Sequence, residues 1–459
     1  MLKRISNWSI SQKIAISFAF VIFTGSLLLT LPISQLPTSE ATYLDNLFTS
    51  VSMVCVTGLF TQSVYESYTI FGQIVGMALM QIGGLGLMTL IASVITRFKK
   101  RIGLRNRLAV QEGINRGDAR GFREYLSDIL KYTAVIEGTG FLLMSFRFVP
   151  LYGWGRGLFT SLFLSISAFC NAGFDNLGNV SLVDYVHDPL VNFVITSLII
   201  LGGIGFSVWF DVTKSIKCFS AKKGKRSLRI FFRSLSLHSR LALLVTVTVI
   251  AVGMLFFVAV EYNNPDSIGT FTFPQKLLAG YFQTVTMRTA GFATIDYTTV
   301  YPFTLFWFVI TMFIGGSPGG TAGGLKTTTF AIVVLMLYNE VRGQSNVNIA
   351  HHTIDKQLVR QALVIFMALL GTLILGASLL SILNPEVNFI YVLFESISAL
   401  ATVGVSANLT PTLGRLSQAV LMFLMFAGRI GPITLVDSLA KSDQKVPDVE
   451  FSKGNILIG

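Results

Sequence analysis

The tetrapeptide Val56-Thr57-Gly58-Leu59 has three relatives further along the chain. They are Asn171-Ala172-Gly173-Phe174, Thr289-Ala290-Gly291-Phe292 and Thr402-Val403-Gly404-Val405. The four glycines are separated by 115, 118 and 113 residues. Each follows a short apolar segment that carries an aromatic residue ten positions upstream of the glycine, at Phe48, Phe163, Tyr281 and Phe394. We therefore interpret the chain as four copies of one unit.

The composition indicates that this unit is embedded in lipid. Of 459 residues, 52% are hydrophobic and only 13% are charged, whereas about a quarter of the residues in soluble domains are charged. The net charge of +12 does not indicate nucleic-acid binding, because the basic residues cluster at 97–123 and 214–240, between apolar segments. Such clustering is typical of cytoplasmic loops in membrane proteins.

Two kinds of apolar segment alternate along the chain. Eight are long enough to span a bilayer, at 14–33, 71–96, 126–148, 190–212, 241–261, 302–338, 358–383 and 416–440. Four are too short to span and end near the repeated glycines, at 44–56, 158–170, 276–288 and 390–402. Irregular backbone is tolerated at membrane depth only where it is buried in protein or lines a water-filled cavity. The pattern predicts an all-α integral membrane protein with eight spanning helices and four re-entrant half-helices.

Each unit contains two spans, so the four units have parallel topology and can surround one pore. The predicted boundaries are 1–110, 111–225, 226–350 and 351–459. The first span follows Lys3, Arg4 and Lys13 and is interpreted as a retained anchor, with both chain termini in the cytoplasm. The predicted outer loops hold acids such as Asp45 and Asp175, which would concentrate cations. Alternatively, these loops merely avoid lysine and arginine.

The four repeated loops are the candidate ion filter. Backbone carbonyls replace the hydration shell of K⁺ when several of them point at one axis, and glycine allows the required backbone angles. The candidate potassium-binding residues are Val56, Thr57, Gly58, Asn171, Ala172, Gly173, Thr289, Ala290, Gly291, Thr402, Val403 and Gly404. The alternative is an ordinary turn glycine in each loop.

A glycine-rich stretch interrupts the helix predicted over 302–338. It reads Gly315-Gly316-Ser317-Pro318-Gly319-Gly320-Thr321-Ala322-Gly323-Gly324-Leu325-Lys326. Glycine and proline at this density cannot sustain a helix, so the stretch predicts a gate just inside the filter. The alternatives are a kinked packing helix and a phosphate-binding loop. The phosphate-binding motif is incomplete, because Lys326 follows a leucine instead of a glycine.

The second helices of the units share a further pattern. Glycine pairs occur in Gly83-Gly84-Leu85-Gly86, Gly202-Gly203-Ile204-Gly205 and Gly315-Gly316, and the fourth unit has Gly428-Arg429-Ile430-Gly431. In the first two units we favour close helix packing as their role.

Two arginines fall in apolar surroundings. A cation at membrane depth usually faces a cavity or a partner, so Arg429 is predicted to form a barrier in the pore. The alternative is an ion pair with Glu137 or another buried acid. Arg288 is predicted to brace the third filter, with Glu395 as its partner.

Together, the filters, the glycine-rich interruption and Gly428-Arg429 resemble the KtrB family, the membrane subunits of bacterial Ktr potassium uptake systems in the Trk/Ktr/HKT superfamily. The resemblance covers essentially the whole chain. It implies K⁺ uptake, often Na⁺-dependent, by a homodimer in the cytoplasmic (inner) membrane. It also implies a cytosolic KtrA-type RCK ring that binds ATP or ADP, for which 97–123 and 214–240 are candidate docking surfaces or simply positive-inside charge.

The resemblance assigns gating to the loop at 315–326 and a pore role to Arg429. One departure is Val56, where two other copies have threonine. No organic cofactor is expected on this chain. A carrier would show inverted repeats and midplane carboxylates, whereas these repeats are parallel. An enzyme would need converging acids, histidines or a nucleophile, and the sequence offers no such constellation.

Overall fold

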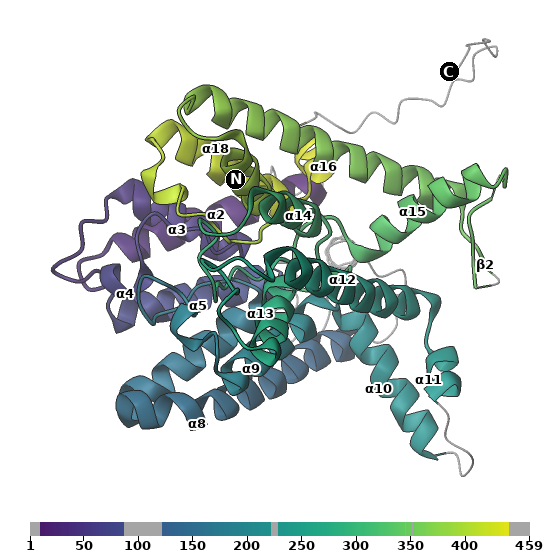
Figure 1. Ribbon diagram of the computed structural model, residues 1–459, viewed down its shortest axis with the longest axis horizontal. Coiled ribbons are helices and arrows are strands. Elements are labelled where there is room, and N and C mark those ends of the chain that lie inside the picture. Colours follow the sequence, from purple (N-terminus) through teal and green to yellow (C-terminus); the bar gives the residue numbers. More distant parts are fainter. Residues whose placement is uncertain (1–9, 87–121, 222–227, 345, 351, 440–459) are drawn as a thin grey trace.

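The computed structural model describes residues 10–86, 122–221, 228–344, 346–350 and 352–439, and most of these residues are helical (Figure 1). The only strands among them form the small hairpin β1 (Asn348–Ile349) and β2 (His352–Thr353). The predicted docking segment 97–123 lies almost wholly outside the described residues, as does part of 214–240.

A long helix, a short helix and a second helix recur four times, as the sequence predicts. The first repeat consists of α2 (Ile10–Thr30), α3 (Tyr43–Cys55) and α5 (Ile70–Leu85), with the one-turn α4 (Val64–Ser67) before α5. The third repeat consists of α12 (Leu237–Glu261), α13 (Phe273–Thr286) and α14 (Pro302–Phe313). The fourth repeat consists of α16 (Lys356–Leu383), α17 (Phe389–Leu400) and α18 (Arg415–Ile430).

In the second repeat the long and short helices are joined. α8 (Phe122–Cys170) is 49 residues long and contains a non-helical glycine, Gly153, with φ 78° and ψ 170°. Pro150 lies three residues before it, and a proline inside a helix removes a backbone hydrogen bond. α8 therefore bends at this point, and its last part is the short helix predicted over 158–170.

Three of the four second helices end at or just before a glycine of the repeated motif that has a positive φ, and α14 ends at Phe313, two residues before Gly315. α9 (Pro189–Gly203) and α10 (Phe206–Ala221) meet at 99°, around Gly205 with φ 94°. α18 and α19 (Pro432–Leu439) are separated by Gly431, also with φ 94°, and α5 ends at Gly86 with φ 79°. The continuous helices predicted over 190–212 and 416–440 are therefore each two helices, because the chain turns at a left-handed glycine.

The repeats contact one another in a closed cycle. α5 packs against α8, α9 against α13, α14 against α17, and α18 against α3. The fourth repeat is thus adjacent to the first, so all four short helices lie around one axis.

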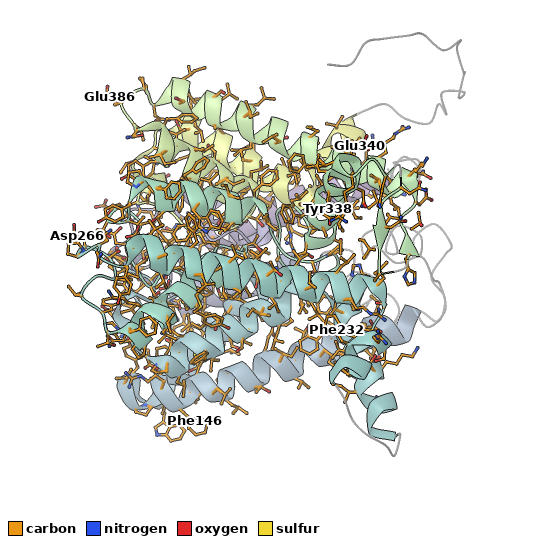
Figure 2. All side chains as sticks on the ribbon, turned by 45° about the vertical axis from the view of Figure 1, so that its right-hand side comes forward. Phe146, Phe232, Asp266, Tyr338, Glu340 and Glu386 are labelled. Atoms are coloured by element: carbon orange, nitrogen blue, oxygen red, sulfur yellow. The ribbon has the colours of Figure 1, made fainter. Side chains whose placement is uncertain are left out.

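Length and hydropathy are consistent with a bilayer around this cycle. Among the described residues, four helices can span a membrane (α2, α8, α12 and α16), and the bent pair α9–α10 makes a fifth. The other second helices are shorter because they end at the glycine breaks. Large apolar side chains face outward, such as Phe146 with 75% exposure, and Figure 2 shows this residue projecting from the surface. Asp266 and Glu386, from two predicted outer loops, lie at one end, and Glu340 lies at the opposite end (Figure 2).

Candidate functional site

Each short helix ends in a turn that carries its filter residues inward. In three repeats the turn is closed by the same main-chain bond, which runs from Thr57 N to Ser52 O, from Ala172 N to Ser167 O and from Val403 N to Ser398 O, at 2.8 Å in each case. The first residue of every predicted filter has a positive φ, namely Val56 (56°), Asn171 (59°), Thr289 (71°) and Thr402 (52°). Positive φ is rare for β-branched residues and persists only where the surroundings enforce it.

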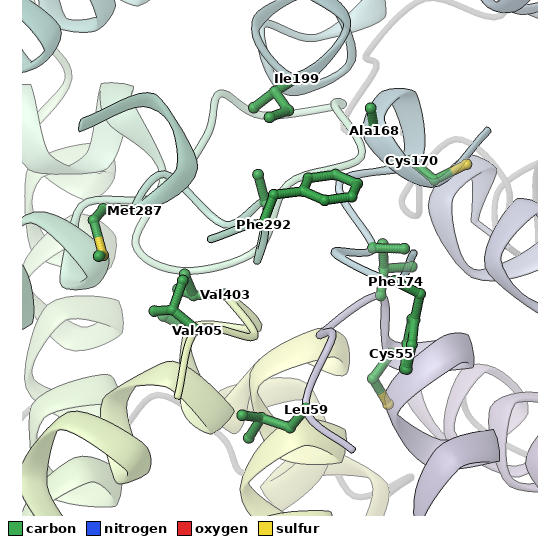
Figure 3. Packing of buried hydrophobic residues seen from close by; sticks show 14 of the residues in the cluster. Cys55, Leu59, Ala168, Cys170, Phe174, Ile199, Met287, Phe292, Val403 and Val405 are labelled. Carbon is green, nitrogen blue, oxygen red and sulfur yellow. The ribbon is translucent and has the colours of Figure 1, made fainter. Parts of the chain in front are cut away.

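The four filter glycines meet in a ring. A Cβ atom added to Gly58 would lie 2.8 Å from Ala172 O, and one added to Gly173 would lie 2.6 Å from Ala290 O. The other two glycines close the cycle. A Cβ atom added to Gly291 would lie 2.7 Å from Val403 O, and one added to Gly404 would lie 2.0 Å from Thr57 O. Each glycine thus lies against the carbonyl of the residue before the next glycine. No other residue type fits, and Figure 3 shows the four loops converging at this point.

Hydroxyl groups hold three of the four loops from behind. The Ser52 hydroxyl accepts from Gly58 N, and the Ser398 hydroxyl accepts from Gly404 N, both at 3.0 Å. In the third repeat Thr286 donates to Phe292 O at 2.7 Å. The spacing could have indicated these serines, because Ser52 and Ser398 each precede their glycine by six residues. Ser167 has the same spacing, but its hydroxyl has no hydrogen-bond partner among the described residues.

The predicted gate loop crosses one face of the ring. Its two ends pair with each other, from Gly315 N to Leu325 O at 2.9 Å. Gly323 N donates to the hydroxyl of Thr289 in the third filter at 3.2 Å. Thr321 donates to Phe169 O, at the end of the short helix in the second repeat, at 3.0 Å. The loop therefore lies on the side of the ring where the chain enters the filters.

Other gate-loop residues attach it to the neighbouring repeat and to itself. Ser317 N donates to Gly203 O at 2.8 Å, and Gly320 lies so close to Gly202 O that an added Cβ would be 2.9 Å away. Lys326 donates through Nζ to Ala322 O at 2.6 Å. The predicted loop residues are thus brought together as one folded segment.

Arg429 holds the gate loop to the first repeat. In the last turn of α18, its guanidinium donates to Thr321 O at 2.5 Å, to Gly84 O at 3.3 Å and to Gly83 O. The last two oxygens belong to the C-terminal end of α5, where a positive charge is favourable. Glu137 instead accepts from Gln81 Nε2 at 3.0 Å. The partners of Arg429 are therefore main-chain carbonyl oxygens and not Glu137.

The pairing predicted between Arg288 and Glu395 is wrong. Arg288 is 6% exposed and donates to Thr246 Oγ1 at 3.2 Å and to Gly315 O at 3.3 Å. Glu395 is fully buried, and its Oε1 accepts from Ser406 at 2.8 Å and from the main chain of Thr410 at 3.1 Å. Among the described residues, only Oε1 of this acid has partners, all within its own loop, and Arg288 instead connects the third filter with α12 and the gate loop.

Two acids in the predicted outer loops have different electrostatic surroundings. Burial tends to raise the pKa of Asp45, but hydrogen bonds from Arg415, Thr42 and Thr61 outweigh it and lower the pKa to about 2. Asp175, two residues after Gly173, is half-buried. Burial raises its pKa to about 6 despite hydrogen bonds from Leu177, Ser181 and Gly178.

The donor chemistry of the ring suits an alkali cation. Among the described residues no group of three or more His, Cys, Asp or Glu side chains could hold a metal ion. The ring instead presents main-chain oxygens of Thr57, Ala172, Ala290 and Val403 beside the glycines, and such oxygens can replace the hydration shell of K⁺.

Comparisons with known proteins agree with this chemistry. A family model described as "TrkH: Cation transport protein" matches residues 4–445. The chain is 39% identical to Ktr system potassium uptake protein B of Bacillus subtilis, over 98% of this chain and 96% of that protein. It is 35% identical to potassium/sodium uptake protein NtpJ of Enterococcus hirae, over 98% and 97%. The crystal structure of the potassium transporter TrkH from Vibrio parahaemolyticus has the same fold, with a TM-score of 0.73, 15% identity, and coverage of 93% and 84%.

Proposed function

Because the chain belongs to the TrkH family of cation transport proteins, which are transporters and not enzymes, we propose that it conducts K⁺ through one pore per chain. K⁺ sheds water as it enters the ring of filter glycines and is held by the main-chain oxygens of the four loops. The protein lies in the cytoplasmic membrane of a bacterium with both termini in the cytoplasm.

The observation that carries this proposal is the cyclic contact of the four glycines. Gly58, Gly173, Gly291 and Gly404 each lie against a carbonyl oxygen of the next loop. A turn glycine needs only its own left-handed angle, and such a turn has no reason to meet three others. The cyclic arrangement supports binding of a cation by backbone oxygens drawn from four loops.

The loop at 315–326 is the gate in this proposal. It contacts the filter side through Gly323 and Thr289, and Arg429 bonds it to the end of α5. A closed gate keeps the cation of Arg429 in the K⁺ path, where it repels K⁺. Opening requires the loop to leave Thr289 and the guanidinium to leave Thr321 O.

Regulation and assembly complete the proposal. The relatives named as parts of a Ktr system support a partner subunit, and we assign that role to a cytosolic KtrA-type RCK ring that binds ATP or ADP. A homodimer of this chain sits on that ring. The Enterococcus relative is named for potassium and sodium uptake, which supports Na⁺ as an activator of K⁺ uptake here.

The test is K⁺ uptake in a bacterial strain that lacks its own K⁺ transporters, with the chain expressed alone and with a KtrA-type partner. Gly404→Ala places a methyl group 2.0 Å from Thr57 O at a glycine with φ 94°, so it should abolish uptake. Gly371→Ala is the matched control, because nothing lies within 4 Å of its Cβ. Normal uptake by Gly404→Ala, with both variants in the membrane, would refute the filter assignment.

A further inference from the structure

A pocket of about 660 Å³ opens between the first two repeats, away from the pore. It lies at the end of the molecule where α4 joins the start of α5, at the left in Figure 1. Its lining includes Tyr65, Glu66, Ile70, Gln73 and Arg156. The volume falls within the range of small-molecule sites, roughly 300–1,000 Å³.

The cation of this pocket is available to a ligand. Arg156 is exposed, and its guanidinium lies 5.2 Å from the ring centre of Tyr65 and 4.9 Å from that of Tyr152. Within the described part of the chain it forms no ion pair, in contrast to Arg147 and Arg415. The rings of Tyr65 and Tyr152 therefore orient the planar guanidinium of Arg156. Its paired N–H donors match the geometry of a phosphate group.

The pocket also offers a negative charge that is separate from the positive one. Glu66 is exposed and accepts from Asn179 Nδ2 at 2.6 Å, and in the described residues it forms no ion pair with Arg156. A ligand that fits must therefore present an anionic and a cationic group together.

The surroundings of the pocket are those of a lipid surface. Ile70 lines the pocket and Ile74 lies one helical turn further along α5, and the two side chains are 65% and 48% exposed. Trp154, two residues before Arg156, is 76% exposed. Exposed tryptophan and tyrosine are typical of the membrane–water interface, so acyl chains can follow α5 while a headgroup occupies the pocket.

We propose that this pocket binds a zwitterionic phospholipid, phosphatidylethanolamine, from the leaflet around this end of the molecule. Its phosphate pairs with Arg156, its ammonium group with Glu66, and its acyl chains with Ile70 and Ile74. The charges of the pocket match this headgroup better than that of phosphatidylglycerol, which has no cation for Glu66.

The pocket is connected to the second filter loop, so the lipid can support the pore. Gln73 accepts at Oε1 from Asn176, three residues after Gly173, at 3.0 Å. Glu66 holds Asn179, and Ser63 donates to Gly178 O at 3.1 Å. Two pocket residues therefore hold the segment that leads out of the second filter.

The test is lipid binding to the full chain in detergent, measured by native mass spectrometry during titration with phosphatidylethanolamine, phosphatidylglycerol or phosphatidylcholine. Wild type should bind phosphatidylethanolamine most tightly. Arg156→Ala should weaken this binding by about tenfold, since a charge-assisted bidentate contact is lost. Glu66→Gln should remove the preference over phosphatidylglycerol. Arg147→Gln and Glu386→Gln change the charge at the same end, outside the pocket, and should bind as wild type does.

Two results would overturn the proposal. One is equal phosphatidylethanolamine binding by wild type and Arg156→Ala, with both proteins unfolding at the same temperature. The other is displacement of the lipid by millimolar inorganic phosphate, which would identify a soluble-anion site instead. The binding measurement needs no transport, so its failure is separate from failure of the proposed K⁺ pore.

Discussion

The guanidinium of Arg288 donates a hydrogen bond to the main-chain oxygen of Gly315 at 3.3 Å. Arg288 immediately precedes the third filter, and Gly315 is the first glycine of the gate loop. The Nε atom of Arg288 has no hydrogen-bond partner among the described residues. A buried cation with so few partners is costly, and here it connects filter and gate directly. We therefore expect movement of the loop at 315–326 to be transmitted to the third filter through this contact.

We expect Arg288→Met to weaken the apparent K⁺ affinity by about tenfold, because the loop loses a charge-assisted hydrogen bond. Discrimination against Na⁺ should fall as well. The measurement is the KM for K⁺ uptake, with Na⁺ as competitor. Thr246→Val removes only the second partner of the arginine and should have a smaller effect. Unchanged KM and selectivity in Arg288→Met would show that this contact is only structural.

Arg429→Met should raise K⁺ uptake in the absence of the partner subunit by roughly tenfold, within the usual range of regulatory coupling. The substitution removes the donor that Thr321 O shares with Gly83 O, so the closed loop is less stable. Removal of Gly316–Gly323 should act in the same direction.

Arg415→Met is a matched control for Arg429→Met, because Arg415 begins the same helix but pairs with Asp45, at the opposite end of α18 from Arg429. It should leave the dependence on the partner unchanged. If Arg429→Met and the loop deletion both lower uptake while the proteins remain in the membrane, the loop is not the barrier.

Spacing alone predicts four equivalent glycine loops, because Gly58, Gly173, Gly291 and Gly404 recur with short apolar segments before them, and the structure brings these loops together. Their role as an ion filter remains a proposal. The breaks in the second helices are harder to predict from the sequence. A glycine pair in an apolar helix can serve packing or bending, and in this chain the motif does both. Gly202 packs against Phe169 O while Gly205, three residues later, turns the chain.

The partners of Arg429 could not be predicted for a different reason. They are main-chain oxygens from two other repeats, and carbonyl groups leave no signature in a sequence. The same holds for Arg288, whose expected acid, Glu395, instead accepts hydrogen bonds at Oε1 from hydroxyl and amide donors in its own loop.

The same substitution, glycine to alanine, tests close packing when it is made separately at Gly428 in α18 and at Gly371 in α16. A Cβ at Gly428 would lie 1.8 Å from Leu400 O, whereas nothing lies within 4 Å of one at Gly371. Gly428→Ala should therefore destabilise the protein by about 1–3 kcal/mol through overpacking. Gly371→Ala should stabilise it by about 0.5–1 kcal/mol, the helical preference of alanine over glycine. Thermal unfolding in detergent measures both, and equal shifts would argue against close packing at Gly428.

Asp175 should make K⁺ uptake sensitive to external pH. Burial raises the pKa of this carboxyl group to about 6, so it is ionised at neutral pH and becomes protonated as the pH falls through that value. Because an ionised carboxylate near the second filter attracts K⁺, the KM for K⁺ should rise by severalfold between about pH 7 and pH 5. Asp175→Asn should have the high KM at both pH values.

Asp45 provides the contrast that identifies the titrating group. Its pKa is lowered to about 2, so it remains ionised throughout the same pH range. The stability it contributes is present above its unfolded pKa, near 3.8, and is lost only as the pH falls toward about 2. Asp45→Asn should therefore retain the pH dependence of wild-type uptake. A pH dependence that survives in Asp175→Asn would exclude this carboxylate and direct attention to groups on the cytoplasmic side.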